Sequence, residues 1–399
     1  MKVTILLMVL IQLLLTGCWD NQEFEEAAFV QGVGLDKADN KINVIAEITK
    51  PSGGTEGASS GQSGAQHIIF QKEADTLLEA FRGMIRTAKR RMDFTHTQIY
   101  IISEKLARET EFPLELDLIR RDTMFRLNSY LFISDKNPVE IFNTPTLYKS
   151  LTSNELASVI EQTKFITEYL PIFHYEFFRF LKDHHTKAYI PIISIKKSDG
   201  HQKVTEITGT AVIKNNRMVG KLNIKESAGL NWLLNQVKGG SVTVVFTDPK
   251  PSRLSIEVRN AETKIKPYLD GNQLKVDIHT KVEATLADNM SRQKVDRAFF
   301  NNAETKIGSE VERLMFSSLK KLKKLETDIT DFELNLRRNN PKEWKKVKAN
   351  WDQLYANADV KIDVDVNINH RGMINESFHF EQKRPSNNPY RFIKTFLGW

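Results

Sequence analysis

The chain has 399 residues, of which 40% are hydrophobic and 27% are charged, and its formal net charge is +7. This composition is ordinary for a globular protein of two or three domains, and the basic excess is too small and too dispersed to predict nucleic-acid binding. The chain contains one cysteine, Cys18, which excludes an internal disulfide and a metal site built from cysteines.

The chain begins with a short hydrophobic run, from Val3 to Leu15, that follows the basic residue Lys2. It is too short to span a bilayer, which takes about 20 apolar residues, and its length is typical of a secretory signal peptide. The run closes on Leu15-Thr16-Gly17-Cys18, where two small residues precede the cysteine. This pattern predicts a bacterial lipoprotein signal, cleaved between Gly17 and Cys18, with a diacylglyceryl group on Cys18. The alternatives are a plain secretory signal and a short buried helix.

Strand and helix patterns alternate through the first part of the chain. The predicted strands are 26–36, 41–49, 67–72, 94–103 and 125–134. The predicted helices are 75–91, 104–109, 113–122 and 138–143. Strand 41–49 has the clearest pattern, because Ile42, Val44, Ala46 and Ile48 are apolar at every second position. Residues 51–66 are rich in glycine and serine and predict a mobile loop.

The second part of the chain changes from short helices to longer elements. Its predicted helices are 152–164, 171–182, 227–237, 292–325 and 341–355. Its predicted strands are 191–197, 204–214, 218–222, four strands between 241 and 286, and 360–370. The long helix carries an apolar stripe formed by Ile307, Val311, Leu314, Met315, Leu322 and Leu325.

These elements predict an α+β protein, with mixed and antiparallel sheets packed by helices. The expected divisions are a signal peptide (1–17), a tether (18–25), an N-terminal α/β domain (26–184), a middle domain (185–240), a C-terminal α/β domain (241–384) and a tail (385–399).

No pattern of catalytic or metal-binding residues stands out. His184 and His185 are adjacent, so on a helix they point about 100° apart and do not easily share one ion. His174, on an aromatic helix, is interpreted as packing, and His96 as structural. Asp359, Asp363 and Asp365 alternate along one side of a predicted strand, which is compatible with a cation site but favours a solvated face. We therefore expect no metal, no cofactor and no catalytic residue.

Four lysines lie near the C-terminal end of the long helix: Lys320, Lys321, Lys323 and Lys324. They could contact phospholipid headgroups or an acidic partner. The plainer interpretation is that they complement the negative end of the helix dipole.

Several segments resemble one family, the Ger(x)C proteins. Cys18-Trp19-Asp20 resembles the start of these proteins, and Gln31 to Asp36 their first strand. The segments 96–108, 120–126, 209–222, 341–344 and 360–372 are similar to later blocks in the same order. One departure is that the family often has a glycine-rich turn after an aspartate near Asp328, whereas Thr330 to Arg338 contains no glycine.

The resemblance implies a lipoprotein C subunit of a GerA-type nutrient germinant receptor of spore-forming bacteria. Such a subunit is non-enzymatic, is anchored by lipid on the outer face of the spore's inner membrane, and has integral-membrane A and B subunits as partners. The alternative is a free-standing surface lipoprotein that binds a small solute. A third class, a wall-active hydrolase, would need paired carboxylates in a cleft.

Overall fold

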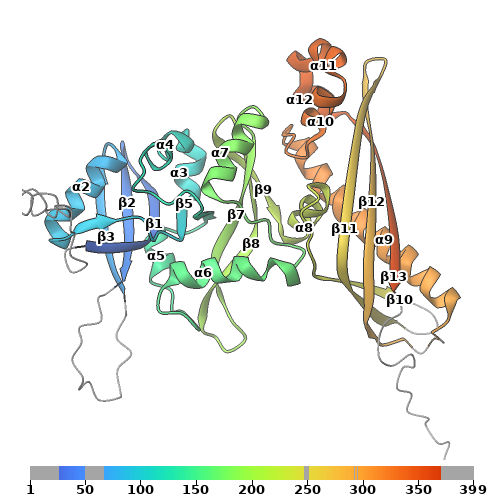
Figure 1. Cartoon of the computed structure of the whole chain (residues 1–399), viewed down its shortest axis with the longest axis horizontal. Coiled ribbons are helices and arrows are strands. Elements are labelled where there is room, and N and C mark those ends of the chain that lie inside the picture. The colour runs from blue at the N-terminus through green and yellow to red at the C-terminus, as the bar shows by residue number, and fades with distance from the viewer. Residues whose placement is uncertain (1–26, 50–66, 247–250, 292, 294, 370–399) are drawn as a thin grey trace, which may run out of the picture.

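The computed structural model describes residues 27–49, 67–246, 251–291, 293 and 295–369. Within them the chain forms two sheets that follow one another along the longest axis, each packed by helices (Figure 1). This architecture confirms the predicted α+β class, with mixed and antiparallel sheets packed by helices. The predicted signal peptide with Gly17 and Cys18, the tether, the loop 51–66 and the tail lie outside the described residues.

The first sheet has nine strands. They are β1 Ala27–Ala38, β2 Lys41–Thr49, β3 His67–Ala74, β4 Arg91–Asp93, β5 Ile99–Ser103, β6 Tyr130–Ser134, β7 Ala188–Lys197, β8 Lys203–Lys214 and β9 Arg217–Asn223. Their order is β3-β2-β1-β5-β6-β7-β8-β9, with β4 beside β1. The central pairs from β1 to β7 are parallel, and the pairs at both edges are antiparallel. The sheet is continuous across residues 184–185, where the sequence suggested a domain boundary.

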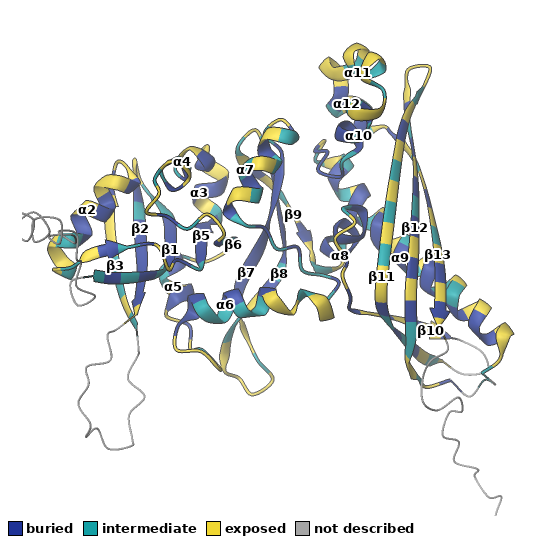
Figure 2. Cartoon of the chain, in the orientation of Figure 1, coloured by how far each residue is buried: buried dark blue, intermediate teal, exposed yellow. Residues whose placement is uncertain are grey.

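Helices cover both faces of this sheet, as parallel strands require. They are α2 Leu77–Ala88, α3 Glu104–Glu109, α4 Asp117–Arg121, α5 Pro138–Phe142, α6 Thr152–Ile160 and α7 His174–Asp183. Every residue of β5 is buried (Figure 2). Ile99 and Ile101 belong to the apolar cluster of α5 and α6, whereas Tyr100 and Ile102 belong to the larger cluster that includes α2, α3 and α7.

The second sheet has four strands, in the order β10 Ser241–Phe246, β11 Ser252–Asp270, β12 Gln273–Asn289 and β13 Asp359–Asn369. The long helix α9 Arg297–Lys324 packs against it, and α8 Ile224–Leu233 lies between α9 and the strands β8 and β9 of the first sheet. The predicted stripe is confirmed: its members are buried except for Leu325, which is half-buried. α9 therefore contacts the second sheet and also α8. We call the region between the two sheets, where α8 and α9 meet, the junction.

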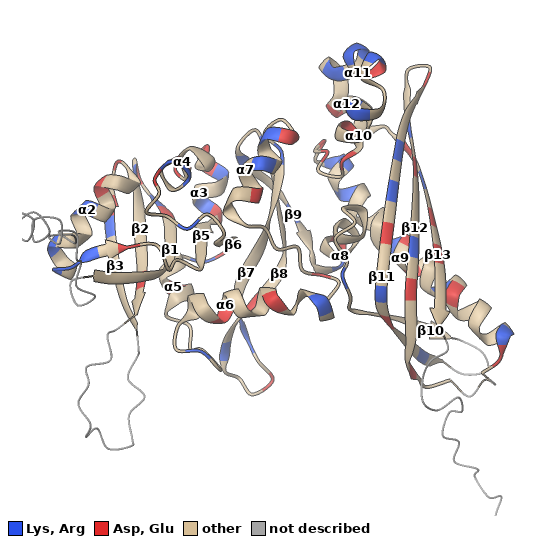
Figure 3. Cartoon of the chain, viewed as in Figure 1, with Lys and Arg blue, Asp and Glu red and all other residues tan. Residues whose placement is uncertain are grey.

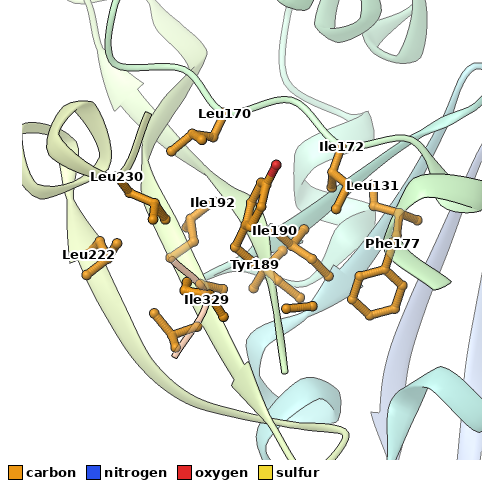
Figure 4. Packing of buried hydrophobic residues seen from close by; sticks show 14 of the residues in the cluster. Leu131, Leu170, Ile172, Phe177, Tyr189, Ile190, Ile192, Leu222, Leu230 and Ile329 are labelled. Carbon is orange, nitrogen blue, oxygen red and sulfur yellow. The ribbon is translucent and has the colours of Figure 1, made fainter. Parts of the chain in front are cut away.

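The chain leaves α9 and returns to the first sheet before entering β13. Ile329, a few residues after α9, is fully buried beside Ile192, Leu222 and Leu230 (Figure 4). Three short helices follow, α10 Phe332–Asn339, α11 Pro341–Val347 and α12 Trp351–Ala356. We call residues 328–356 the cap, because they cover the end of the junction (Figure 1).

Some predicted elements differ from the structure. Residues 241–286 form three strands rather than four, because register shifts at Ser255/Ile256 and Val258/Asn260 let β11 continue through a polar stretch. The predicted helix 341–355 is split by a 3₁₀ turn, Lys348–Asn350, after which Trp351 turns inward and is buried.

Other differences lie at element ends. The strand predicted at 125–134 begins only at Tyr130, because Ser129 closes a turn by donating from Oγ to the Arg126 and Thr97 carbonyls. The strand predicted at 94–103 likewise begins at Ile99, after a turn in which the Thr97 N–H donates to the Phe94 carbonyl. The helix predicted at 113–122 is divided into a 3₁₀ turn, Phe112–Leu114, and α4.

Candidate functional site

A cavity of about 730 Å³ lies between the cap and the first sheet. The sheet side supplies His185, Lys187 and Asn215. The cap side supplies Glu333, Arg337, Trp344, Lys348, Ala349, Asn350, Trp351, Asp352 and Gln353. Charged side chains of opposite sign thus meet across the junction, which makes this cavity the candidate site.

Two lysines of the sheet converge on one carboxylate of the cap. The pairing of Ala188 with Ile213 brings Lys187, just before β7, next to Lys214, at the end of β8. Asp352 lies 2.7 Å from the Lys187 ammonium and 2.9 Å from the Lys214 ammonium. Burial alone would raise the pKa of Asp352, but the hydrogen bonds and charges of the two ammonium groups outweigh burial and lower it.

Glu333 is the second carboxylate of the cavity, and it is only 2% exposed. It lies 3.6 Å from the Lys187 ammonium and 3.0 Å from His185 Nε2. Burial raises the pKa of Glu333, although the Lys187 charge opposes the shift. Both carboxylates are thus held by basic groups of the sheet side, Glu333 by Lys187 and His185 and Asp352 by Lys187 and Lys214. This arrangement joins the cap to the sheet, and we call these facing side chains the clamp.

Asp328 organises the cap from inside. It is fully buried, and its carboxylate accepts four hydrogen bonds. The Thr330 N–H and hydroxyl donate to Oδ1 at 3.0 and 2.9 Å, and the Glu333 N–H and Trp351 Nε1–H donate to Oδ2 at 2.8 and 3.1 Å. Asp328 therefore fixes the start of α10 and ties it to α12.

The cap also resolves the local conformation left open by the absence of glycine between Thr330 and Arg338. Asp331 adopts the left-handed region, with φ of 65°, directly before α10. Aspartate tolerates this region better than most residues. Its carboxylate is 3.0 Å from His184 Nε2, so a polar contact with the end of the preceding α7 segment accompanies the unusual backbone.

The two adjacent histidines have different partners. Both follow the last residue of α7, and His185 adopts a φ of 50°, so the helical geometry assumed from the sequence does not apply to them. His184 stacks on Phe180 at 3.9 Å between ring centroids and faces Asp331, whereas His185 faces Glu333. Both therefore belong to the clamp, a role that the sequence did not suggest.

The other sequence candidates lie away from the clamp. His96 is exposed and packs edge-on against Phe29. Asp359, Asp363 and Asp365 are exposed along β13, and Asp363 lies 2.9 Å from His279 Nδ1. Within the described ranges, no group of three or more His, Cys, Asp or Glu residues could hold a metal ion.

Lys187, Lys214, Asp328, Glu333 and Asp352 were not predicted as site residues. Only Asp328 carried a local signal, since an aspartate two residues before a threonine favours a turn in which its side chain accepts from the backbone. The others are ordinary surface residue types in the sequence, and only the fold brings them together.

The prediction that His174 packs among aromatic side chains is confirmed, and the residue is more deeply buried than expected. It is fully enclosed, with its ring centroid 5.0 Å from that of Phe178 and 5.7 Å from that of Tyr100. Burial lowers the pKa of His174 from its ordinary 6.5 to about 4. The folded protein therefore keeps this imidazole neutral at pH values where the unfolded chain protonates it.

This shift predicts a loss of stability in mild acid. Because the folded-state pKa is depressed, the stabilisation is present above pH 6.5 and is lost as the pH falls towards 4. When the pH falls from 7.5 to 5, the protonation of His174 in the unfolded chain should lower the free energy of unfolding by about 2 kcal/mol. Urea unfolding of the wild type and His174→Phe at both pH values measures this difference, with His96→Phe as the exposed control. Equal pH dependence in wild type and His174→Phe would contradict it.

No helix in the described part of the chain combines the length and the apolar character needed to cross a membrane.

Comparison with known proteins gives two consecutive family matches. Residues 20–195 match the spore germination protein N-terminal domain, and residues 208–372 match the C-terminal domain described as spore germination B3/GerAC like. The chain is 26% identical to spore germination protein KC of Bacillus subtilis, over 90% of this chain and 92% of that one. It is 23% identical to spore germination protein B3 of the same organism, over 91% and 96%.

A solved structure supports the same fold. The crystal structure of the GerBC protein matches with a TM-score of 0.57 at 19% identity, covering 88% of this chain and 99% of that one. With the two domain matches in sequence order, the chain belongs to the Ger(x)C family of spore germination proteins.

Proposed function

We propose that this protein is a non-enzymatic C subunit of a nutrient germinant receptor, required for spore germination in response to nutrients. The observation that carries the proposal is the pair of family matches, which together extend from residue 20 to residue 372. The clamp supports a structural role, because its charged groups pair with one another across the junction. In this function the protein stabilises or couples its partners.

The proposed attachment is a lipid on Cys18, exposed when the signal is cleaved after Gly17. One acyl chain gives marginal membrane binding, whereas two anchor a protein stably. A diacylglyceryl group would hold the protein on the outer face of the spore's inner membrane, beside integral-membrane A and B subunits. Confinement to that surface raises the effective concentration of the protein near these partners.

The test is crosslinking and pull-down from spore membranes, comparing the wild type with Cys18→Ala. We expect the wild type in the membrane fraction together with two polytopic proteins. We expect Cys18→Ala to be soluble or unprocessed, to lose these partners and to leave the spores defective in nutrient germination. Normal membrane retention and a normal germination response in Cys18→Ala would overturn the proposal.

A second candidate function, small-solute binding by a free-standing lipoprotein, has one observation in its favour. A cleft of about 410 Å³ is lined by Tyr130, Tyr169, Phe173, Tyr189 and Asn231, among others. Asn231 is buried, and its Oδ1 accepts no hydrogen bond from any described residue. A ligand with a hydrogen-bond donor would satisfy this atom. A small molecule that copurifies with the protein, detected by mass spectrometry, would favour this function over the receptor role.

A further inference from the structure

Positive charge is concentrated on the cap and on the adjoining end of α9. The segment from Lys320 to Asn350 contains ten lysine and arginine residues and five acidic residues, and so holds +5 of the chain's net +7. It includes the end of α9, all of α10 and α11, and the 3₁₀ turn. Figure 3 shows this charge as blue on α11 and at the upper end of α9.

The acidic side chains of this segment are on the whole less exposed than the basic ones. Asp328 and Glu333 are buried inside the cap, Asp331 and Glu343 are half-buried, and Glu326 is exposed. The exposed cations form what we call the basic surface: Lys320, Lys324, Arg338, Lys342, Lys345, Lys346 and Lys348. Among the described residues, none of these seven takes part in an ion pair. The inward carboxylates therefore do not neutralise the outward cations.

Helix dipoles do not account for this arrangement. Basic residues in the last turns of α9, α10 and α11 would each be stabilised by the negative end of a helix. Lys342, however, follows Pro341 in the first turn of α11, where the positive end of the dipole disfavours a cation. The lysines of α11 are therefore found at both ends of the helix, and the helix dipole does not explain why they occur together.

The end of α9 adds an apolar element to the same region. Phe316 is 44% exposed and precedes the exposed Lys320 and Lys324 by one and two helical turns. Residues at this spacing share one helix face. An exposed aromatic ring beside lysines is the composition of segments that lie at a membrane–water interface. α12 packs against α9, so the cap and this face are neighbours.

We propose that the basic surface binds the headgroups of an anionic phospholipid bilayer. Lys348 lies at the cavity described above, whereas the other six cations lie on the exposed sides of α9, α10 and α11. Cations spread over helices suit an extended negative surface better than one small anion. The proposal deepens the lipid-anchored function and rests on it for its biological setting.

The test uses the processed chain from residue 18 carrying Cys18→Ala, so that no lipid anchor contributes. Cosedimentation is measured with vesicles of phosphatidylcholine alone and with vesicles that also contain phosphatidylglycerol. The cap variant is Lys342→Gln/Lys345→Gln/Lys346→Gln. The matched control is Lys196→Gln/Lys197→Gln/Lys203→Gln, which removes the same charge from exposed positions on the β7–β8 hairpin.

We expect binding only to the phosphatidylglycerol vesicles, weakening as salt rises. The cap variant should bind about 10- to 100-fold more weakly, on the basis of the free energy that each basic residue near an anionic surface contributes. The control should remain within about twofold of the parent. If both variants weakened binding equally, the effect would depend only on net charge, and the proposal would be overturned. An unaffected cap variant, or equal binding to both vesicle types, would overturn it as well.

These vesicles contain no receptor subunits and the protein carries no lipid. A negative result therefore leaves the germinant-receptor proposal standing, and a failure of the pull-down leaves this one standing.

Discussion

Gly229→Ala is expected to lower the free energy of unfolding by about 3 kcal/mol. A methyl group at this position would lie 2.0 Å from the carbonyl oxygen of Leu314, which belongs to the backbone of α9. Neither backbone can yield without moving a helix, because α9 also lies close to β13: a methyl group on Gly308 would lie 2.9 Å from the Val364 carbonyl oxygen. Widening the gap between α8 and α9 would loosen the junction. Urea unfolding followed by tryptophan fluorescence measures the effect.

The matched control is Gly83→Ala in α2. Its nearest neighbour would be Lys72 Cε at 3.2 Å, near the end of a flexible side chain that can move away. Alanine is the better helix former by roughly 0.5–1 kcal/mol, so this variant should be slightly more stable than the wild type. If both glycine variants had the same stability, the close approach of α8 and α9 would not be what constrains Gly229.

The elements that the sequence predicted best are those whose pattern is purely local. The stripe on α9 follows the helical period and is buried as expected, apart from the half-buried Leu325. The residues Ile42, Val44, Ala46 and Ile48 follow the strand period and are buried as expected, but Ile45 and Glu47 on the other face are buried as well, so β2 is not the half-buried strand that its pattern predicted. The limits of β5 and β6 were less accurate, because the turns before them depend on hydrogen bonds between segments, such as that from Ser129 Oγ to the Thr97 carbonyl.

The clamp could not be predicted, because its members are distant in sequence. Lys187 and Asp352 are separated by 165 positions, and nothing in either neighbourhood distinguishes them from solvated surface residues. Their meeting depends on the register of β7 with β8 and on the return of the chain after α9. Gly229 presented a similar difficulty: a glycine inside a helix indicates a constraint, but the carbonyl that imposes it lies on another helix.

The clamp and the core of the cap have different energetic roles. The pairs made by Lys187 and Lys214 with Asp352 lie at the edge of a cavity, where Asp352 is about one-third exposed, so solvent screens them. The bonds to Asp328 are enclosed, and each donor there would remain unsatisfied if the carboxylate were removed. The largest loss of cap stability should therefore come from Asp328, which makes no contact across the cavity.

Asp328→Ala is expected to destabilise the protein by about 4 kcal/mol. Four donors, from Thr330, Glu333 and Trp351, would lose their acceptor inside the cap, and each buried unsatisfied group costs about 1–3 kcal/mol before the structure relaxes. Asp328→Asn keeps one acceptor oxygen and should lose about half as much. Asp365→Ala, at an exposed position on β13, is the control and should stay within about 0.5 kcal/mol of the wild type.

Limited proteolysis shows which part of the protein the Asp328→Ala change destabilises. Because Asp328 joins the start of α10 to Trp351 of α12, its removal should open the cap before either sheet unfolds. New cleavage is therefore expected at the basic residues between Arg337 and Lys348, while the strands of both sheets remain protected. Cleavage in the sheets with an intact cap, or a loss of stability below about 1 kcal/mol, would show that the cap is held chiefly by the ion pairs across the cavity.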